Sequence, residues 1–394
     1  MKKTLLILLI IILFVGSMFL GYMYLNNKIS DDSKDHKEIS NSEKNKDETY
    51  PKDIPSLDEI TLDKAKNLLN TMSLEEKVGQ MFFARCRKDT AISDLTTYNL
   101  GGFILFDDNI RDESRETLSS NISSYQDASR TPMFIAVDEE GGTVNRLSNY
   151  TAFRSYPFDS PRELYASGGF DLIEKDTIEK ANLLKSLGIN MNLAPVADVS
   201  TNSYDYIYDR TFGDNAKETS EYVSLVVKTM KENNIGSSLK HFPGYGNNQD
   251  THEGFSIDER SYETFKTSDF LPFIDGIKAG ASSILVSHNI VKAMDEELPA
   301  SLSPKVNKVI RDTLGFNGVI MTDDLQMSAI KEYIGDTKSA VLAVIAGNDL
   351  IIASDFDIQI PSVLESINNG EITEERINES VLRILYLKID LGLI

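Results

Sequence analysis

The feature that most limits the possible folds of this chain is a repeated alternation of short apolar runs with longer helical patterns. Eight runs have the length of buried strands: 80–83, 102–106, 133–137, 189–193, 237–241, 283–287, 318–322 and 349–353. Continuous apolar runs separated by helices are typical of parallel sheets, whose strands are covered on both faces. Eight such units predict an α/β fold of the (β/α)8 barrel type, whose usual size is about 250 residues before insertions.

The segments between the runs have the spacing of amphipathic helices. Apolar residues recur at helical intervals over 223–230, and Gly236 follows where that helix is expected to stop. A similar pattern over 377–388 predicts a final helix. A doubly wound open sheet is the alternative fold, but no glycine-rich dinucleotide turn follows the first run, so we favour the barrel.

The N-terminal part of the chain differs from the rest. After two lysines, an uncharged apolar run covers 5–25, and as a helix it would extend about 31 Å, the thickness of a bilayer's hydrocarbon core. We predict that residues 1–28 are an uncleaved membrane anchor with the rest exported to the outer face of the cytoplasmic membrane. A cleaved signal sequence is the alternative. The polar residues 29–56 predict a flexible linker, and 57–394 the barrel domain.

The charge and the cysteine content exclude several classes of function. With 61 acidic against 40 basic residues and a net charge of -21, the chain lacks the basic face of a nucleic-acid binder. Its one cysteine, Cys86, excludes an intramolecular disulfide and a cysteine-based zinc site. The paired-histidine spacing of hydrolytic zinc sites is also missing, so we expect neither a metal nor another cofactor. We expect a monomer.

Polar residues follow the apolar runs at the points where the strands should end. In a (β/α)8 barrel the active site is built at the carboxyl ends of the strands. Three of the four histidines lie at these positions or in the loops that follow them. Several acids and bases lie there as well, and the residues at the strand ends are Asp138–Glu140, Asp198, Asp209–Arg210, Lys240–His241, His288 and Asp323–Asp324. The pattern therefore predicts a barrel enzyme, in which Asp198 is expected to brace a loop.

The loop after the fifth run pairs an acid with a histidine. Asp250 and His252 are two residues apart in a stretch that contains several glycines. A carboxylate beside an imidazole stabilises the imidazolium and fixes its tautomer. Because the ordinary pKa of histidine is about 6.5, such a pair can donate a proton at neutral pH. We therefore predict that this loop supplies a general acid/base.

These residues resemble the β-N-acetylglucosaminidase branch of the family 3 glycoside hydrolases. Five motifs occur in order over about residues 60–390. They are Val137–Gly142 with Arg146, Asn192–Asp198, Asp209–Gly213, Lys240–Gly244 followed by Asp250-Thr251-His252, and Gly318–Leu325. The chain departs from the family pattern at Thr143, Tyr245 and Asn247, where an arginine, a histidine and an aspartate are usual. We expect these three departures to affect which leaving groups the enzyme prefers.

The resemblance implies a retaining exo-β-N-acetylglucosaminidase that hydrolyses terminal β-linked N-acetylglucosamine from small oligosaccharides, with peptidoglycan fragments (muropeptides) as the natural substrate. Asp323 would be the nucleophile that forms a covalent glycosyl-enzyme. His252, paired with Asp250, would be the general acid/base. The sugar would be held by Asp138, Arg146, Arg210, Lys240 and His241.

Other assignments remain open at this point. Asp324 competes with Asp323 as the nucleophile, although strand alternation should turn only one of the two inward. A catalytically idle surface barrel that binds sugar is one alternative function. An enzyme that uses phosphate as the acceptor is another, because a histidine base repels an anion less than a carboxylate base does.

Overall fold

The structure is a computed structural model that describes residues 58–394 except 214, 252–253, 255 and 332–333. The predicted anchor (1–28), the predicted linker (29–56) and His252 thus lie outside the described residues. Within the part of the chain that the structure does describe, no helix is both long and apolar enough to cross a bilayer.

The eight predicted runs all form strands of one parallel sheet. The strands are β1 (Phe82–Arg85), β2 (Gly102–Ile104), β3 (Phe134–Val137), β4 (Met191–Asn192), β5 (Gly236–Phe242), β7 (Ser283–Val286), β9 (Val319–Thr322) and β10 (Ile351–Ala353). Their order is β10-β1-β2-β3-β4-β5-β7-β9. A parallel bridge between Met321 and Leu350 joins β9 to the segment before β10. The sheet is therefore nearly closed, which confirms the barrel over the open sheet.

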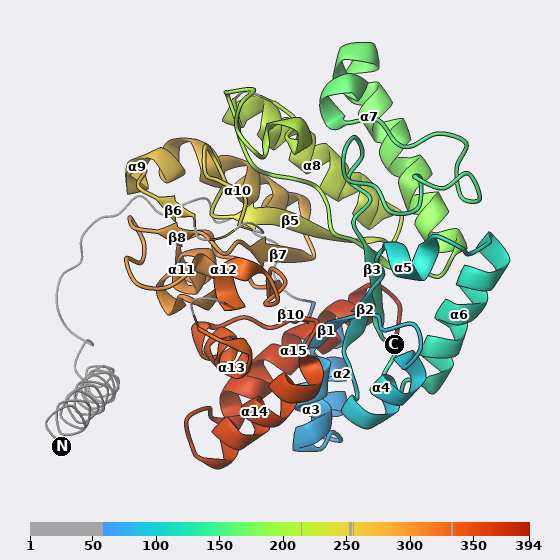
Figure 1. Ribbon diagram of the computed structural model, residues 1–394, viewed down its shortest axis with the longest axis vertical. Coiled ribbons are helices and arrows are strands. Elements are labelled where there is room, and N and C mark those ends of the chain that lie inside the picture. The colour runs from blue at the N-terminus through green and yellow to red at the C-terminus, as the bar shows by residue number, and fades with distance from the viewer. Residues whose placement is uncertain (1–57, 214, 252–253, 255, 332–333) are drawn as a thin grey trace, which may run out of the picture. The chain divides into compact units, whose positions relative to one another are not determined.

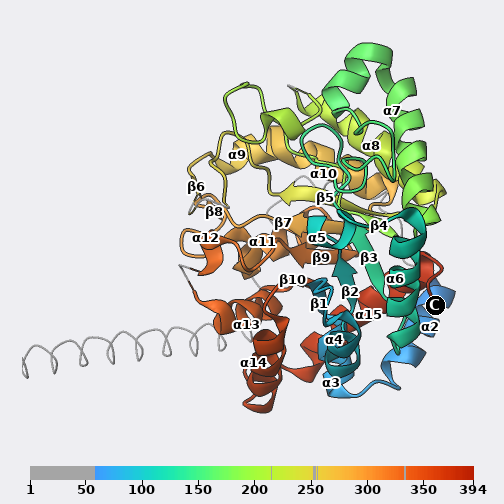
Figure 2. The ribbon, with the colours of Figure 1, turned by 45° about the vertical axis from the view of Figure 1, so that its right-hand side comes forward.

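Helices connect the strands and surround them (Figure 1). They are α2 (Glu59–Leu69), α3 (Leu74–Gln80), α4 (Ala91–Tyr98), α5 (Asp107–Ile110), α6 (Arg115–Ala128), α7 (Pro161–Ser186), α8 (Ala216–Glu232), α9 (Tyr262–Thr264), α10 (Phe270–Ala279), α11 (Pro304–Lys308), α12 (Ser328–Lys331), α13 (Asp336–Ala346), α14 (Phe356–Asn368) and α15 (Glu374–Asp390). In the turned view of Figure 2, α8 and α10 lie on one side of the strands and α13 and α14 on the opposite side.

The strands are largely apolar because both of their faces are buried. All four residues of β3 and all four of β9 are buried. Side chains inside the barrel and those beneath the helices form one continuous hydrophobic core. This burial explains why the sequence shows continuous apolar runs rather than alternation.

Two details of the fold differ from the prediction. The helix α8 ends at Glu232, and Gly236 is the first residue of β5 instead of the helix stop. Asn234 takes the left-handed conformation after the helix, with φ of 55°, which asparagine tolerates better than most residues. A short second sheet of β6 (Ile257–Asp258) and β8 (Ile290–Val291) was also unexpected, since two-residue strands leave no periodic signal.

Candidate active site

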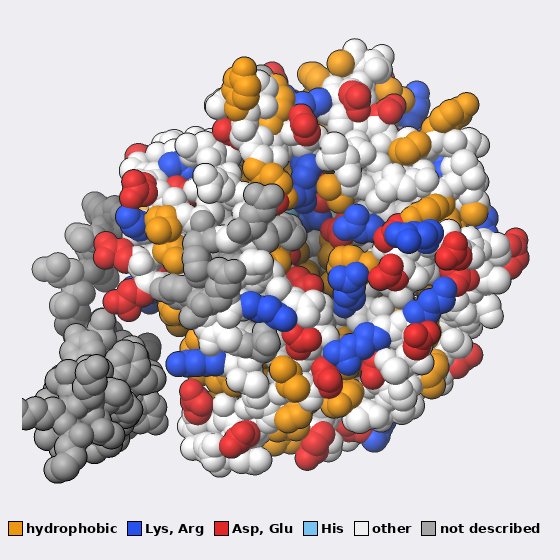
Figure 3. Space-filling model, viewed as in Figure 1, with side chains coloured by type: hydrophobic (Ala, Val, Ile, Leu, Met, Phe, Trp, Pro, Cys, Tyr) orange, Lys and Arg blue, Asp and Glu red, His pale blue; other side chains and the backbone are white. Residues whose placement is uncertain are grey.

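A cavity of about 450 Å³ is lined by residues at the carboxyl ends of the barrel strands. Six of the eight predicted site residues line it: Asp138, Arg146, Arg210, Lys240, His241 and Asp323. In Figure 3, Lys and Arg side chains gather around a hollow near the middle of the visible face. The barrel thus brings together residues from five separate loops and strand ends.

Glu140 links two of the predicted cations, although the sequence analysis, which noted it at a strand end, did not predict it as a sugar-binding residue. Its carboxylate accepts hydrogen bonds from Arg210 Nε at 3.0 Å and Nη2 at 2.7 Å, and lies 2.5 Å from Lys240 Nζ. Burial alone would raise the pKa of this carboxyl, but the charges of Arg210 and Lys240 outweigh it and hold the pKa well below its usual range. Glu140 is therefore an ionised anchor for both cations.

Asp138 contacts the same cluster from the end of β3. Its Oδ1 accepts a hydrogen bond from Lys240 Nζ at 2.8 Å, and its Oδ2 lies 3.4 Å from Arg146 Nη2. The ammonium of Lys240 is therefore shared between two carboxylates. Such a cluster presents both donors and acceptors to a ligand with several hydroxyl groups.

The partners of His241 fix its tautomer. The ring Nδ1 lies 2.8 Å from Asp198 Oδ2, and Nε2 lies 3.2 Å from Arg210 Nη2. A guanidinium can only donate, so Nε2 accepts and the ring proton sits on Nδ1, from which it is donated to Asp198. His241 and Glu140 thus both hold Nη2 of Arg210.

Asp198 also binds backbone N–H groups at the end of β5 and in the loop that follows it. Its Oδ2 accepts from the backbone N–H of His241 at 3.0 Å, and its Oδ1 accepts from the backbone N–H of Tyr245 at 2.7 Å. The carboxylate is fully buried. Its location between β4 and β5 therefore sets the path of the loop that continues to Asp250.

The two acids after β9, Asp323 and Asp324, are both among the residues that line the cavity, so the lining alone does not choose between them. The strand ends at Thr322, and beyond that point the alternation of a strand no longer applies. Asp324 is engaged elsewhere, because its carboxylate accepts from the backbone N–H of Gln326 at 3.0 Å and from Ser354 Oγ at 3.1 Å. Burial raises the pKa of Asp324.

His288 contacts the backbone of the same turn. Its Nε2 lies 2.9 Å from the carbonyl oxygen of Asp324, and its Nδ1 lies 2.7 Å from Ser301 Oγ. The carbonyl can only accept, so Nε2 carries the proton. His288 is fully buried and is not among the residues that line the cavity. We therefore assign it a packing role.

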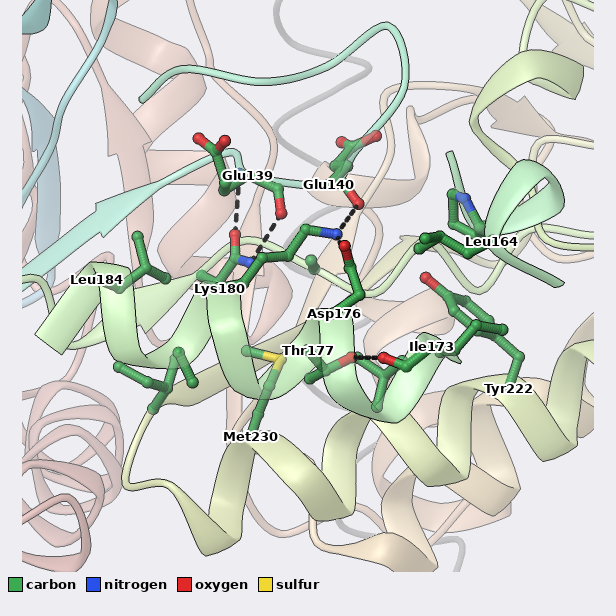
Figure 4. A pocket seen from close by; sticks show the side chains of 16 residues that line it. Glu139, Glu140, Leu164, Ile173, Asp176, Thr177, Lys180, Leu184, Tyr222 and Met230 are labelled. Carbon is green, nitrogen blue, oxygen red and sulfur yellow. Dashed lines mark hydrogen bonds and ion pairs between the residues drawn. The ribbon is translucent and has the colours of Figure 1, made fainter. Parts of the chain in front are cut away.

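A buried ion pair on α7 holds the backbone behind the cluster (Figure 4). Lys180 Nζ donates to Asp176 Oδ2 at 2.6 Å and to the carbonyl oxygen of Glu140 at 3.1 Å. Burial raises the pKa of Asp176, and the charge of Lys180 opposes that shift. The neighbouring Glu139 points away from the cluster and caps the turn that carries Arg146, since it accepts the backbone N–H of Arg146 at 2.9 Å.

The predicted acid/base pair is described only in part. Asp250 is half-buried, and burial together with the charge of Asp250 raises the pKa of Tyr206. His252 lies outside the described residues, so its pairing with Asp250 stays a prediction. Tyr206, like Glu140, was not predicted from the sequence as a sugar-binding residue. An aromatic residue four positions before Arg210 gives no local signal of a site.

The fold and the site define a class of protein. A nearly closed eight-stranded parallel barrel carries a cavity at its carboxyl ends, and paired carboxylates and cations surround that cavity, as in (β/α)8-barrel enzymes that bind polar ligands. The chain belongs to glycosyl hydrolase family 3, because the model for the family's N terminal domain matches residues 73–387.

Individual relatives agree with this assignment. A Beta-hexosaminidase of Tolumonas auensis is 31% identical over 273 residues, which are 68% of this chain and 80% of that protein. Beta-hexosaminidase A of Pseudoalteromonas piscicida is 27% identical over 332 residues, and the match spans 75% of this chain but only 54% of that relative. A solved family 3 β-N-acetylglucosaminidase from Paenibacillus sp. str. FPU-7 has a TM-score of 0.76 and 29% identity, with 82% of this chain and 63% of that chain covered.

Proposed function

We propose that this protein is a retaining exo-β-N-acetylglucosaminidase that hydrolyses terminal β-linked N-acetylglucosamine. The observation that carries the proposal is that Asp323 lines the same cavity as the cluster of Asp138, Lys240 and Arg210. A carboxylate nucleophile thus faces a set of hydroxyl-binding groups. The names of the relatives, β-hexosaminidase and β-N-acetylglucosaminidase, support the choice of sugar.

The charges of the cavity suit a neutral sugar. Four carboxylates and four cations line it: Asp138, Glu140, Asp323, Asp324, Arg85, Arg146, Arg210 and Lys240. Most of these charged side chains already form ion pairs with one another. A ligand without net charge can therefore bind without supplying a counter-charge. The cations can donate to hydroxyl groups and to the N-acetyl carbonyl, while Asp138 can accept from hydroxyl groups.

In the first chemical step, the Asp323 carboxylate attacks the anomeric carbon. The bond from this carbon to the leaving oxygen breaks, and His252 gives its proton to that oxygen. In the second step His252 takes a proton from water, the water oxygen attacks the anomeric carbon, and the ester to Asp323 breaks. Two displacements at one carbon retain the β-configuration.

We further propose that the enzyme is anchored in the cytoplasmic membrane, acts outside it and removes N-acetylglucosamine from peptidoglycan fragments. The apolar run over 5–25 and the polar stretch over 29–56 support this placement. An exported, tethered glycosidase would meet such fragments at the cell surface.

Release of nitrophenol from nitrophenyl N-acetyl-β-glucosaminide by the full chain tests the activity. We expect turnover with this substrate, at least about tenfold slower turnover with the β-glucoside, and an initial product of β-configuration by NMR. Binding of N-acetylglucosamine without turnover would instead indicate the sugar-binding barrel, and an initial α-product would exclude the double displacement.

A further inference from the structure

Arg85 is a cation of the cavity that lies outside the sugar-binding cluster. It is the last residue of β1 and lines the same cavity as Asp323. Its side chain is 42% exposed, so a ligand can reach it from the solvent. In the sheet, β1 lies between β10 and β2, whereas Asp138 follows β3 and Lys240 lies in β5. Arg85 is therefore beside the cluster rather than part of it.

The guanidinium of Arg85 is held by an aromatic ring. Its Cζ lies 4.3 Å from the centroid of the Phe106 ring, and Phe106 also lines the cavity. Arg146, one of the predicted sugar-binding residues, lies over the same ring with its Cζ 5.7 Å from the centroid. Stacking on an aromatic face holds a guanidinium without using its N–H groups. Phe106 therefore joins Arg85 to the edge of the cluster and leaves its donors able to bind a ligand.

The charge of Arg85 is only weakly compensated. Within the described residues its ion-pair partner is Asp108, whose Oδ2 lies 3.7 Å from Arg85 Nη2, beyond hydrogen-bond distance. The Asp108 side chain is 75% exposed, so water and salt screen this pair. Arg210, by contrast, makes two hydrogen bonds to the buried Glu140. Arg85 can therefore bind an anion from a ligand without first breaking a strong ion pair.

We propose that Arg85 is a specificity-determining residue that binds a carboxylate on the leaving group of the substrate. This inference rests on the proposed function. The cluster holds the terminal sugar, which carries no charge, so a cavity cation beside the cluster faces the part of the substrate that departs. A guanidinium can donate two parallel N–H groups to one carboxylate. The position of Arg85 thus favours an acidic leaving group over a neutral one.

The test compares three substrates that share a terminal N-acetylglucosamine in β-1,4 linkage. The leaving sugar is N-acetylmuramic acid, which carries a carboxylate, or its neutral methylamide, or the same sugar with an alanyl-glutamate dipeptide on that carboxylate. The dipeptide moves the negative charge outward, so it separates a carboxylate of the sugar from one of a peptide. We expect the wild-type full chain to have at least about fivefold higher kcat/KM on one of the acidic substrates than on the methylamide.

Variants of Arg85 should change this preference in a graded way. Arg85→Gln should remove it, with less than about twofold change on the methylamide. Arg85→Lys keeps the charge without the planar fork and should keep part of the preference. Arg87→Gln is the matched control, because Arg87 also stacks on a ring, that of Phe356, but donates to Asp357 at 2.8 Å and is not among the residues that line the cavity. It loses the same charge and should keep the full preference.

Several outcomes would overturn the role of Arg85 and leave the proposed function intact. They are a wild-type chain that prefers neither acidic substrate, a preference that persists in Arg85→Gln, an equal loss on all three substrates, and an equal loss of the preference in Arg87→Gln. A wild-type chain that releases N-acetylglucosamine from none of the three substrates and no nitrophenol from the nitrophenyl glycoside would instead overturn the proposed function, and the role of Arg85 with it.

Discussion

At the scale of single residues, the neighbours Asp323 and Asp324 show how contacts separate two similar side chains. Both reach the cavity. The Asp324 carboxylate is occupied by Ser354 and by the backbone of Gln326, and a carboxylate held in this way is poorly placed to attack a carbon atom. Asp323 Oδ1 accepts the backbone N–H of Asp324 at 2.8 Å. These contacts favour Asp323 as the nucleophile.

We therefore predict that Asp323→Asn loses nearly all turnover, by about a thousandfold or more, while it still folds and binds N-acetylglucosamine. Asp324→Asn, the matched control, should keep a much larger share of the activity. A 2-fluoro glycoside should label Asp323 of the wild-type protein, which peptide mass spectrometry can locate. A label on Asp324 would contradict the assignment.

At the scale of elements, the connection after β5 depends on a carboxylate from the connection after β4. Asp198 accepts three N–H groups, two from the backbone and one from the ring of His241. Asparagine has the same shape but one oxygen fewer. Its amide N–H group would face a donor on one side or the other, and a buried donor without an acceptor costs about 1–3 kcal/mol.

Asp198→Asn should accordingly lower the free energy of unfolding by roughly 1–3 kcal/mol. It should also raise KM, because His241 would no longer be held with its proton on Nδ1, and Arg210 would then lose Nε2 of His241 as an acceptor. Urea denaturation and steady-state kinetics measure the two effects. Asp205→Asn is the control, since Asp205 is only half-buried and accepts a hydrogen bond from Ser200 Oγ, and there we expect less than about 0.5 kcal/mol. Equal effects at the two positions would argue against the bracing role.

At the scale of the whole molecule, Lys388 makes stability depend on pH. This residue of α15 is fully buried, and its Nζ lies 2.6 Å from Gln80 Oε1. Burial lowers its pKa from 10.5 to about 7. As the pH falls from 10.5 towards 7, the unfolded chain binds a proton that the folded chain does not. The free energy of unfolding therefore falls over this range, by up to roughly 5 kcal/mol, and levels off below the folded pKa.

Lys388→Met should remove this dependence. We expect the variant to unfold at higher urea concentration at pH 7, with a gain of roughly 2 kcal/mol after the cost of leaving Gln80 without a donor. The slope of stability between pH 7 and pH 10 should also become flatter. Lys228→Met, at an exposed position of α8, should leave the slope unchanged. The same slope in the wild type and in Lys388→Met would show that Lys388 is not the group responsible.

Removal of residues 1–55 should give a soluble protein with unchanged kcat and KM. The barrel domain starts with α2, whose N-cap Asp58 accepts from the backbone N–H of Thr61 at 2.8 Å and donates its own N–H to the Tyr386 hydroxyl at 2.9 Å. A chain that begins at Ser56 keeps both contacts. Kinetics on the nitrophenyl substrate and membrane fractionation of the full chain check this prediction. An inactive truncated protein, or a full chain found in the cytosol, would contradict it.

The strands and the barrel could be predicted from the sequence because their signals are local. A parallel strand that is buried on both faces is mostly apolar, and this holds for runs such as 134–137 and 319–322. The boundaries of elements were less predictable. Gly236 begins a strand instead of ending a helix. A Cβ at this position would lie 2.8 Å from Met191 Cγ, so the glycine meets a tertiary requirement that no local pattern shows.

For the site, the sequence by itself determined which chemical groups stand at the strand ends, and the resemblance suggested their roles. Only the tertiary structure decided which groups meet. Glu140 reaches Arg210 across 70 positions of sequence, and Lys388 reaches Gln80 across 308. No local pattern encodes such pairs, because closure of the barrel sets these distances. Burial then makes the pairs strong, since water no longer competes for the same hydrogen bonds.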